Sequence, residues 1–194
     1  LSEMGIGTAI TFALYQPIAK NDTEKQKSLM RLYCRMYCIV AVVVAVIGLA
    51  LIPFLGILIK DSYAVDHLIL IYLLYLVNTV CSYLLIYKKA LMDAHQLLYI
   101  GVFYQTMSWV LQDVFQIAVL ILTRNFILFL SISIFTTILF NIGISKRADR
   151  LYPYLKDAKT APLPDDEKKS IYRNMRAMLM HKSGDVILNN TDNL

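Results

Sequence analysis

Residues 36–59 read MYCIVAVVVAVIGLALIPFLGILI, and none of these 24 side chains is charged. The hydrocarbon core of a bilayer is about 30 Å thick, so about 20 apolar residues of helix are enough to cross it. Backbone groups in lipid must be hydrogen-bonded within their own segment, which favours a helix. The stretch therefore predicts a membrane-spanning helix, and Pro53 near its end predicts a kink.

Similar apolar runs follow one another along the chain. Of its 194 residues, 58% are hydrophobic and only 17% are charged, with a mean hydropathy of +0.56. Soluble domains carry about a quarter charged residues, so this composition excludes a soluble enzyme, a nucleic-acid-binding domain and a disulfide scaffold. We expect an all-α, polytopic transmembrane helix bundle with about five membrane-spanning helices, over residues 1–19, 29–59, 68–87, 97–122 and 126–144.

The basic residues predict how these helices are oriented. The net charge is +5, and 17 of the 19 lysine and arginine side chains fall in alternate connections between the apolar runs. Loops rich in lysine and arginine stay on the cytoplasmic side. We therefore place the loops around residues 20–28, 88–96 and 145–182 in the cytoplasm. In the first of these loops, we expect Asn21 to cap the following helix, with Glu24 completing a capping box.

The composition changes after residue 144, which divides the chain into three parts. Residues 1–144 form the predicted transmembrane bundle, and residues 145–182 a cytoplasmic linker. Residues 183–194 are interpreted as the start of a further, truncated transmembrane helix. Because the chain begins within an apolar run and without Met, we expect it to be an interior piece of a longer membrane protein. The linker contains a basic helix that is predicted to lie on the membrane surface or, alternatively, on a neighbouring loop, with one apolar face formed by Ile171, Met175, Met178 and Leu179.

The cysteine, tyrosine and histidine residues do not predict a catalytic or metal-binding site. The cysteines are interpreted as small packing residues. Most tyrosines are interpreted as an aromatic belt at the membrane interfaces. The three histidines fall in separate loops without metal-ligand spacing. The tyrosines placed in the belt include Tyr15, Tyr33, Tyr37, Tyr87 and Tyr99.

Asp113 is the main charge inside the predicted membrane region. A charge at this depth costs at least about 2.5–3.5 kcal/mol on insertion scales, so it needs an explanation. At 100° per residue, Gln105, Trp109, Gln112 and Gln116 share one side of the helix with it. For this stripe we favour a hydrated cavity in which Asp113 carries a proton or a cation.

Three other predicted helices also have one polar face. Such groups either line a cavity or form hydrogen bonds across packed helices, and for serine, threonine and asparagine we favour the hydrogen bonds. The cavity candidates on all four helices are Glu3, Thr11, Asn78, Gln105, Gln112, Asp113, Gln116 and Asn141.

Several short segments resemble bacterial polysaccharide transporters, which are Wzx-type lipid-linked oligosaccharide flippases of the MATE/MOP superfamily. Residues 2–10 (SEMGIGTAI) and 13–19 (ALYQPIA) resemble their second helix, and residues 87–96 (YKKALMDAHQ) resemble a short cytoplasmic motif. Residues 152–154 (YPY) and 181–193 resemble the linker and the start of the seventh helix. The resemblance covers the whole chain in order.

This resemblance implies a two-lobe transporter with alternating access, of which the chain is an N-terminal-lobe fragment. It implies that the protein is not an enzyme, and that it flips undecaprenyl-pyrophosphate-linked oligosaccharide units across the bacterial plasma membrane for capsule, exopolysaccharide or O-antigen synthesis. The implied partners are this lipid-linked oligosaccharide, membrane lipids and other polysaccharide-assembly proteins, but no nucleic acid. No cofactor or metal is expected, and H⁺ or Na⁺ is the candidate coupling ion. Cationic groups would receive the pyrophosphate, and the candidates are Arg31, Arg35, Lys88 and Lys89.

Two other functions stay open from the sequence. A cation-coupled drug or solute exporter of the same superfamily would use Asp113 and Glu3. A membrane-embedded polysaccharide polymerase is less favoured, because the loops opposite the basic ones are too short to carry a catalytic cluster.

Overall fold

The chain folds into an all-α bundle of membrane-spanning type. The structure is a computed structural model that describes residues 6–58, 67–156, 163–164, 166, 168–174, 176–177 and 180, and this part of the chain contains no strand. Within these described residues, four helical stretches are long and apolar enough to cross a membrane: Thr23–Phe54, Leu68–Ala94, Leu98–Thr123 and Phe126–Leu151. The first predicted helix lies partly outside the described residues, and its described portion is shorter than the other four.

The elements follow the apolar runs, with differences at their ends. The second run becomes three consecutive pieces, because Pro53 lies in a 3₁₀ turn that interrupts the α-helix, as its position predicts. The last long helix continues beyond residue 144 to Leu151. The elements are α1 (Ile6–Ala19), α2 (Thr23–Leu51), η1 (Ile52–Phe54), α3 (Leu55–Leu58), α4 (Leu68–Tyr83), α5 (Tyr87–Ala94), α6 (Leu98–Thr123), α7 (Phe126–Leu151) and η3 (Pro153–Lys156).

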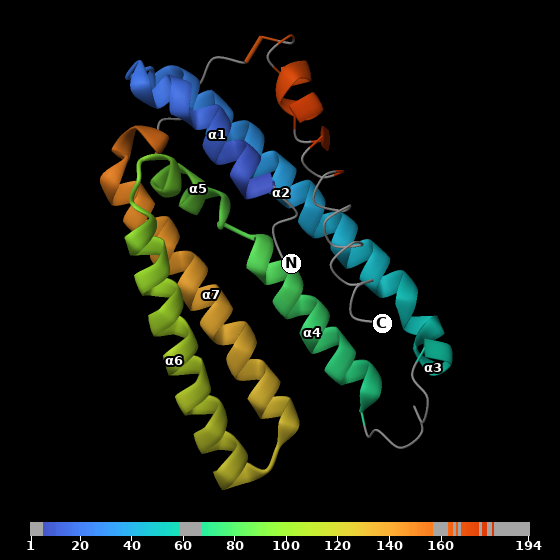
Figure 1. Cartoon of the computed structure of the whole chain (residues 1–194). Coiled ribbons are helices and arrows are strands. Elements are labelled where there is room, and N and C mark those ends of the chain that lie inside the picture. Colours follow the sequence, from blue (N-terminus) through green and yellow to red (C-terminus); the bar gives the residue numbers. More distant parts are fainter. Residues whose placement is uncertain are drawn as a thin grey trace, which may run out of the picture.

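The long helices pack side by side in the order α2, α4, α7 and α6 (Figure 1). The short helix α5 contacts α1, α2, α6 and α7 at one end of the bundle, measured along the helix axes, and we call this end the α5 end. The α6–α7 turn lies at the opposite end of the bundle. The basic residues that begin α2, those of α5 and those that end α7 therefore share the α5 end.

The turn between α1 and α2 differs from the predicted capping box. Asn21 has a φ of 52° and ends α1, since the Asp22 N–H donates to the Pro17 carbonyl (2.9 Å) and the Asn21 N–H to the Ile18 carbonyl (3.0 Å). This is a Schellman motif, in which asparagine tolerates the left-handed conformation. Asp22 is the N-cap of α2, because its carboxylate accepts from the Lys25 N–H at 2.9 Å.

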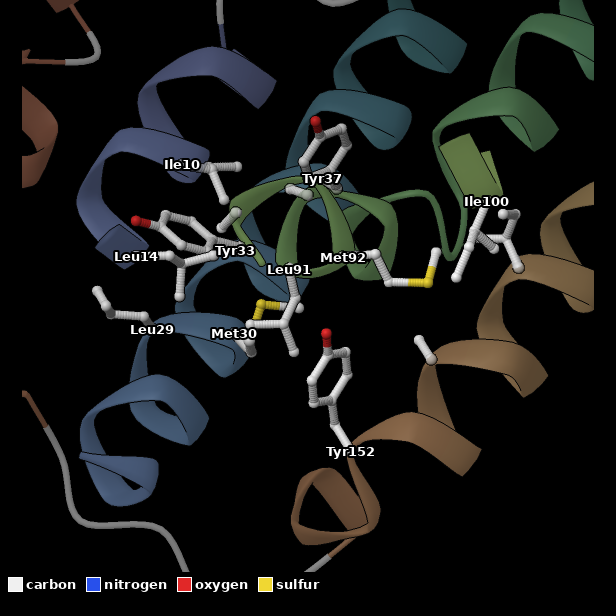
Figure 2. Close-up of a cluster of buried hydrophobic side chains, with 14 of the residues drawn as sticks. Ile10, Leu14, Leu29, Met30, Tyr33, Tyr37, Leu91, Met92, Ile100 and Tyr152 are labelled. Atoms are coloured by element: carbon white, nitrogen blue, oxygen red, sulfur yellow. The ribbon is translucent and has the colours of Figure 1, made fainter. Parts of the chain in front are cut away.

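The predicted inner loop 88–96 is largely a helix. The chain leaves α4 at Leu84, passes through Leu85 with a φ of 66°, and starts α5 at Tyr87. Leu91 and Met92 of α5 are fully buried in the core (Figure 2). Because apolar side chains from the surrounding helices cover α5, this segment forms the centre of the core at that end.

Two of the tyrosines assigned to the aromatic belt are core residues instead. Tyr33 and Tyr37 of α2 are buried and point toward α1 and α5 (Figure 2). Tyr15 and Tyr99, by contrast, are exposed. Contact with α1 and α5 therefore places these two α2 side chains in the protein core rather than at the membrane interface.

The linker packs against the α5 end. The Tyr154 hydroxyl donates to Oε1 of Gln26, and Gln26 Nε2 donates to the Pro17 carbonyl at 3.3 Å, so η3, α2 and α1 are joined. Residues 168–174 are helical, and Ile171 packs on the edge of the core. The predicted apolar-face residues Met175, Met178 and Leu179, like residues 183–194, lie outside the part for which side chains are described.

Candidate functional site: a neutral pocket between the helices

A pocket of about 290 Å³ lies between α2, α4, α6 and α7, and we call it the bundle pocket. It lies next to the predicted polar faces, and none of the described side chains that line it is charged. The lining consists of amide, hydroxyl, aromatic and aliphatic groups, from Tyr37, Ser82, Tyr83, Ile86, Gln105, Ser108, Trp109, Gln112, Thr137, Phe140 and Asn141.

Hydrogen bonds between helices position several of the residues that line the bundle pocket. On the α4 side, Thr137 donates to Asn78 Oδ1 at 2.9 Å, and Asn141 Nδ2 donates to the Cys81 carbonyl at 2.7 Å. The bonds predicted for these threonine and asparagine positions are confirmed. They fix α4 against α7 and leave Thr137 and Asn141 at the pocket surface.

The glutamines of α6 make similar bonds to α7. Thr136 donates to Gln112 Oε1 at 2.9 Å, and Gln116 Nε2 donates to Ser133 Oγ at 2.6 Å and to the Phe129 carbonyl at 3.1 Å. Gln116 is buried and does not line the bundle pocket, whereas Gln112 lines it. The predicted cavity stripe is thus divided between helix packing and the pocket surface.

Asp113 is exposed on α6 and does not line the bundle pocket. It makes no hydrogen bond or ion pair within the described part of the chain. Asp113 follows Trp109 by one helical turn, which places it on the flank of α6 that borders the bundle pocket. Its predicted role in carrying a proton or cation stays a prediction.

A second pocket, of about 250 Å³, lies at the α5 end between α1, α2, α5 and α6, and we call it the α5 pocket. Unlike the bundle pocket it contains charge, because Lys89 and Asp93 line it and form an ion pair at 2.7 Å. Thr11, a cavity candidate, lines this pocket, and its hydroxyl donates to the Gly7 carbonyl at 2.9 Å.

Packing around Lys89 and Asp93 positions the two side chains of this ion pair. The stem of Lys89 runs over Gly101, where a Cβ atom would lie 2.9 Å from Lys89 Cε. Asp93 uses Oδ2 for the ion pair, and its buried Oδ1 has no hydrogen-bond partner among the described residues. One oxygen of the Asp93 carboxylate is therefore used by the ion pair, and the other is buried.

The four pyrophosphate candidates are not brought together. Lys88 is half-buried and pairs with Asp149 of α7 at 2.7 Å, and Lys89 pairs with Asp93. Arg31 and Arg35 are exposed on α2 and line neither pocket. Glu3, the remaining cavity candidate, lies outside the described residues.

Several pocket residues were not predicted from the sequence as site candidates. Tyr37 and Tyr83 had only the general signal of interfacial tyrosines, and Asp93 is a charge in a predicted loop. Ser82 and Trp109 carried a usable signal, because they share helix faces with Asn78 and Gln105. The lining of the α5 pocket depends on α5 being a helix, which local sequence patterns do not indicate.

No protein-family model matches the chain, and no curated protein or solved structure matches it either. The chemistry of the bundle pocket is therefore the main guide to function.

Proposed function

We propose that the chain is part of a membrane transporter that moves a lipid-linked oligosaccharide across the bilayer, with the sugar passing through the bundle pocket. The single observation that supports this is the lining of the pocket. Ligand sites combine aromatic surface with a few placed polar groups, and this pocket has both inside a bundle whose outer surface is apolar.

The polar groups of the pocket suit a sugar. The amides of Gln105, Gln112 and Asn141 supply donors and acceptors on the same side chain, which match the hydroxyl groups of a glycan. The rings of Tyr83 and Trp109 are amphipathic, so they pack against the apolar face of a sugar while their polar atoms stay near hydroxyl groups. The lipid portion of such a substrate would stay in the bilayer beside the exposed apolar surfaces of the helices.

The distribution of charge supports an orientation for this transporter. The basic residues gathered at the α5 end support a cytoplasmic location for that end in a bacterial plasma membrane. A substrate made in the cytoplasm would then reach the bundle pocket from the α5 end.

The leaflet distribution of the lipid-linked oligosaccharide tests this proposal. In cells depleted of the protein, we expect the sugar to accumulate on the inner leaflet, where an impermeant glycan-oxidising reagent added outside does not reach it. Trp109→Ala and Gln105→Ala should slow translocation about tenfold, a barrier change of about 1.4 kcal/mol. Ile121→Ala, on the exposed surface of the same helix, is the matched control. An unchanged leaflet distribution after depletion would refute the proposal.

A cation-coupled exporter is the second candidate, and the exposed Asp113 beside Trp109 favours it. An exporter of cations is expected to place a carboxylate at its ligand, but the described lining of the bundle pocket is neutral. Asp113→Asn removes this carboxylate and leaves the residues that line the bundle pocket unchanged, so it tests coupling without altering the proposed sugar site. Loss of transport in the folded variant would support a role for the Asp113 carboxylate in coupling, and normal transport would remove it from the mechanism.

A further inference from the structure

The bundle pocket and the α5 pocket share two lining residues, Tyr37 and Ile86. Tyr37 comes from α2 and is almost fully buried beside α5 (Figure 2). Ile86 comes from the segment between α4 and α5 and is half-buried. Since each side chain contacts both cavities, the pair forms a common wall between them.

The two cavities differ in charge. The α5 pocket contains the Lys89–Asp93 ion pair, whereas the bundle pocket is lined by neutral groups. Because the α5 pocket lies at the α5 end, a polar ligand that moves from that end into the bundle would meet the ion pair first. It would then have to pass Tyr37 and Ile86 to reach the amides and Trp109.

The backbone departs from helical geometry directly before Ile86. The chain is extended at Leu84, with a ψ of 134°, and left-handed at Leu85, with a φ of 66°. A leucine in the left-handed region costs about 1 kcal/mol or more, so this connection is not at its conformational optimum. A change at these residues would move Ile86 and α5 without unwinding α4.

We infer that the two pockets are successive compartments of one polar pathway from the α5 end, closed in this structure by a wall formed by Tyr37 and Ile86. The inference rests on the proposed use of the bundle pocket for transport, and it adds the route by which a polar ligand reaches that pocket. Tyr37 and Ile86 act here as gating residues, while the ion pair marks the outer compartment.

Solvent access to a cysteine in the bundle pocket tests this route. In the full-length protein, all native cysteines, including Cys34, Cys38 and Cys81, are replaced by serine or alanine, and Gln105→Cys supplies one thiol in the inner compartment. Membrane vesicles of both orientations are treated with a membrane-impermeant maleimide. Lys146→Cys, exposed on α7 near the α5 end, and Arg124→Cys, at the other end, identify which face the reagent reaches.

We expect Tyr37→Ala to raise the labelling rate from the α5 side about tenfold, as for a barrier lowered by about 1.4 kcal/mol. Tyr83→Ala is the matched control, because Tyr83 lines the bundle pocket but not the α5 pocket, and it should leave this rate nearly unchanged. Tyr37→Phe keeps the ring and should also leave it unchanged. Ile86→Ala opens the same wall and replaces Tyr37→Ala if the latter does not fold.

Equal acceleration by Tyr37→Ala and Tyr83→Ala would overturn the inference, and so would the absence of acceleration in both wall variants. Acceleration from the Arg124 side alone would also overturn it. The labelling needs no substrate, so it is independent of the leaflet experiment. A route that opens in a protein with no effect on lipid-linked sugar would contradict the proposed function but not the pathway.

Discussion

Lys88 Nζ lies 2.7 Å from Asp149 Oδ1, so an ion pair joins α5 to the last turn of α7 across 61 positions of sequence. The two side chains are 14% and 23% exposed, which makes the pair partly protected from solvent. Lys88 stands two residues after Ile86 of the wall between the pockets. The pair therefore fixes the start of α5, the helix that follows Ile86, against α7.

Removal of one partner should destabilise the protein. In Lys88→Met, Asp149 keeps its charge in a poorly solvated position, and we expect a loss of about 1–3 kcal/mol, between the values for exposed and buried pairs. The measurement is the thermal unfolding midpoint in detergent, which should fall by several degrees. Lys146→Met removes an exposed charge from α7 and is the control. A double variant with the charges exchanged, Lys88→Asp with Asp149→Lys, should recover part of the loss, and no recovery would argue against a direct pair.

His95 should make stability depend on pH. It follows α5 and stacks on Tyr152, with ring centroids 4.6 Å apart, and its buried Nε2 has no hydrogen-bond partner among the described residues. Burial lowers the pKa of His95 below its ordinary value of 6.5. The unfolded chain therefore binds a proton more readily than the folded one, so the contribution is complete above pH 6.5 and is lost as the pH falls toward the lowered pKa.

Unfolding midpoints measured between about pH 5 and pH 8 check this sign, since they span the ordinary pKa of histidine. His95→Phe keeps a ring against Tyr152 without a titrating group, so its midpoint should lose the part of the pH dependence that comes from this site. Substitution of the exposed His67 by Phe is the control. A wild-type midpoint that rises as the pH falls through this range would contradict the assignment.

The sequence predicted the long helices well because lipid leaves the backbone few alternatives. Runs such as residues 36–59 and 126–144 must satisfy their own hydrogen bonds, so their composition is enough to identify them. The α5 helix was missed because its sequence, YKKALMDA, has charges next to apolar residues, as an exposed turn would. Its burial depends on four other elements that surround it, and no local pattern contains that information.

The candidate site was predicted only in outline for the same reason. Polar faces on several helices indicated that some side chains would meet inside the bundle, and Gln105, Gln112 and Asn141 do line one pocket. Helical periodicity shows which residues share a face, but it does not show which helix that face meets. Tyr37 illustrates the limit, since it resembles an interfacial tyrosine in sequence and forms the boundary between two pockets in the structure.

The contact between α2 and α4 should depend on a small residue at position 48. A Cβ atom on Gly48 would lie 2.3 Å from Leu76 Cδ1, and the Tyr72 hydroxyl donates to the Gly48 carbonyl at 2.8 Å. Small residues allow membrane helices to approach closely. We expect Gly48→Ala to lower the unfolding midpoint by a few degrees, corresponding to about 1 kcal/mol or more for overpacking.

Gly56→Ala is the matched control for this prediction, because a Cβ at that position would have no described atom within 4 Å beyond its chain neighbours and its own helix backbone. The cause is checked by adding Leu76→Ala, which removes the methyl group that the new Cβ would meet. The double variant should then lose less than the sum of the single losses. Additive losses would show that Gly48 matters for another reason, such as backbone freedom.

The hydrogen bonds between α6 and α7 should contribute measurably to stability even though the bundle is surrounded by lipid. The Thr136 side chain is 1% exposed, and its hydroxyl bonds to Gln112 Oε1 of the other helix as well as to α7 carbonyls. Thr136→Val keeps the shape but removes the donor, which leaves Gln112 Oε1 without that partner.

Interhelical bonds in membranes contribute about 0.6 kcal/mol on average, with a maximum near 1.7 kcal/mol. We expect a loss toward the upper end of this range, because Thr136 itself is almost fully buried. Thr123→Val, at the exposed end of α6, removes a hydroxyl that donates within its own helix and accepts from the Asn125 N–H of the adjoining turn, and it should cost less because the site is exposed. Unfolding of both variants in the same detergent gives the comparison, and equal losses would show that the bond across the helices adds nothing beyond the local one.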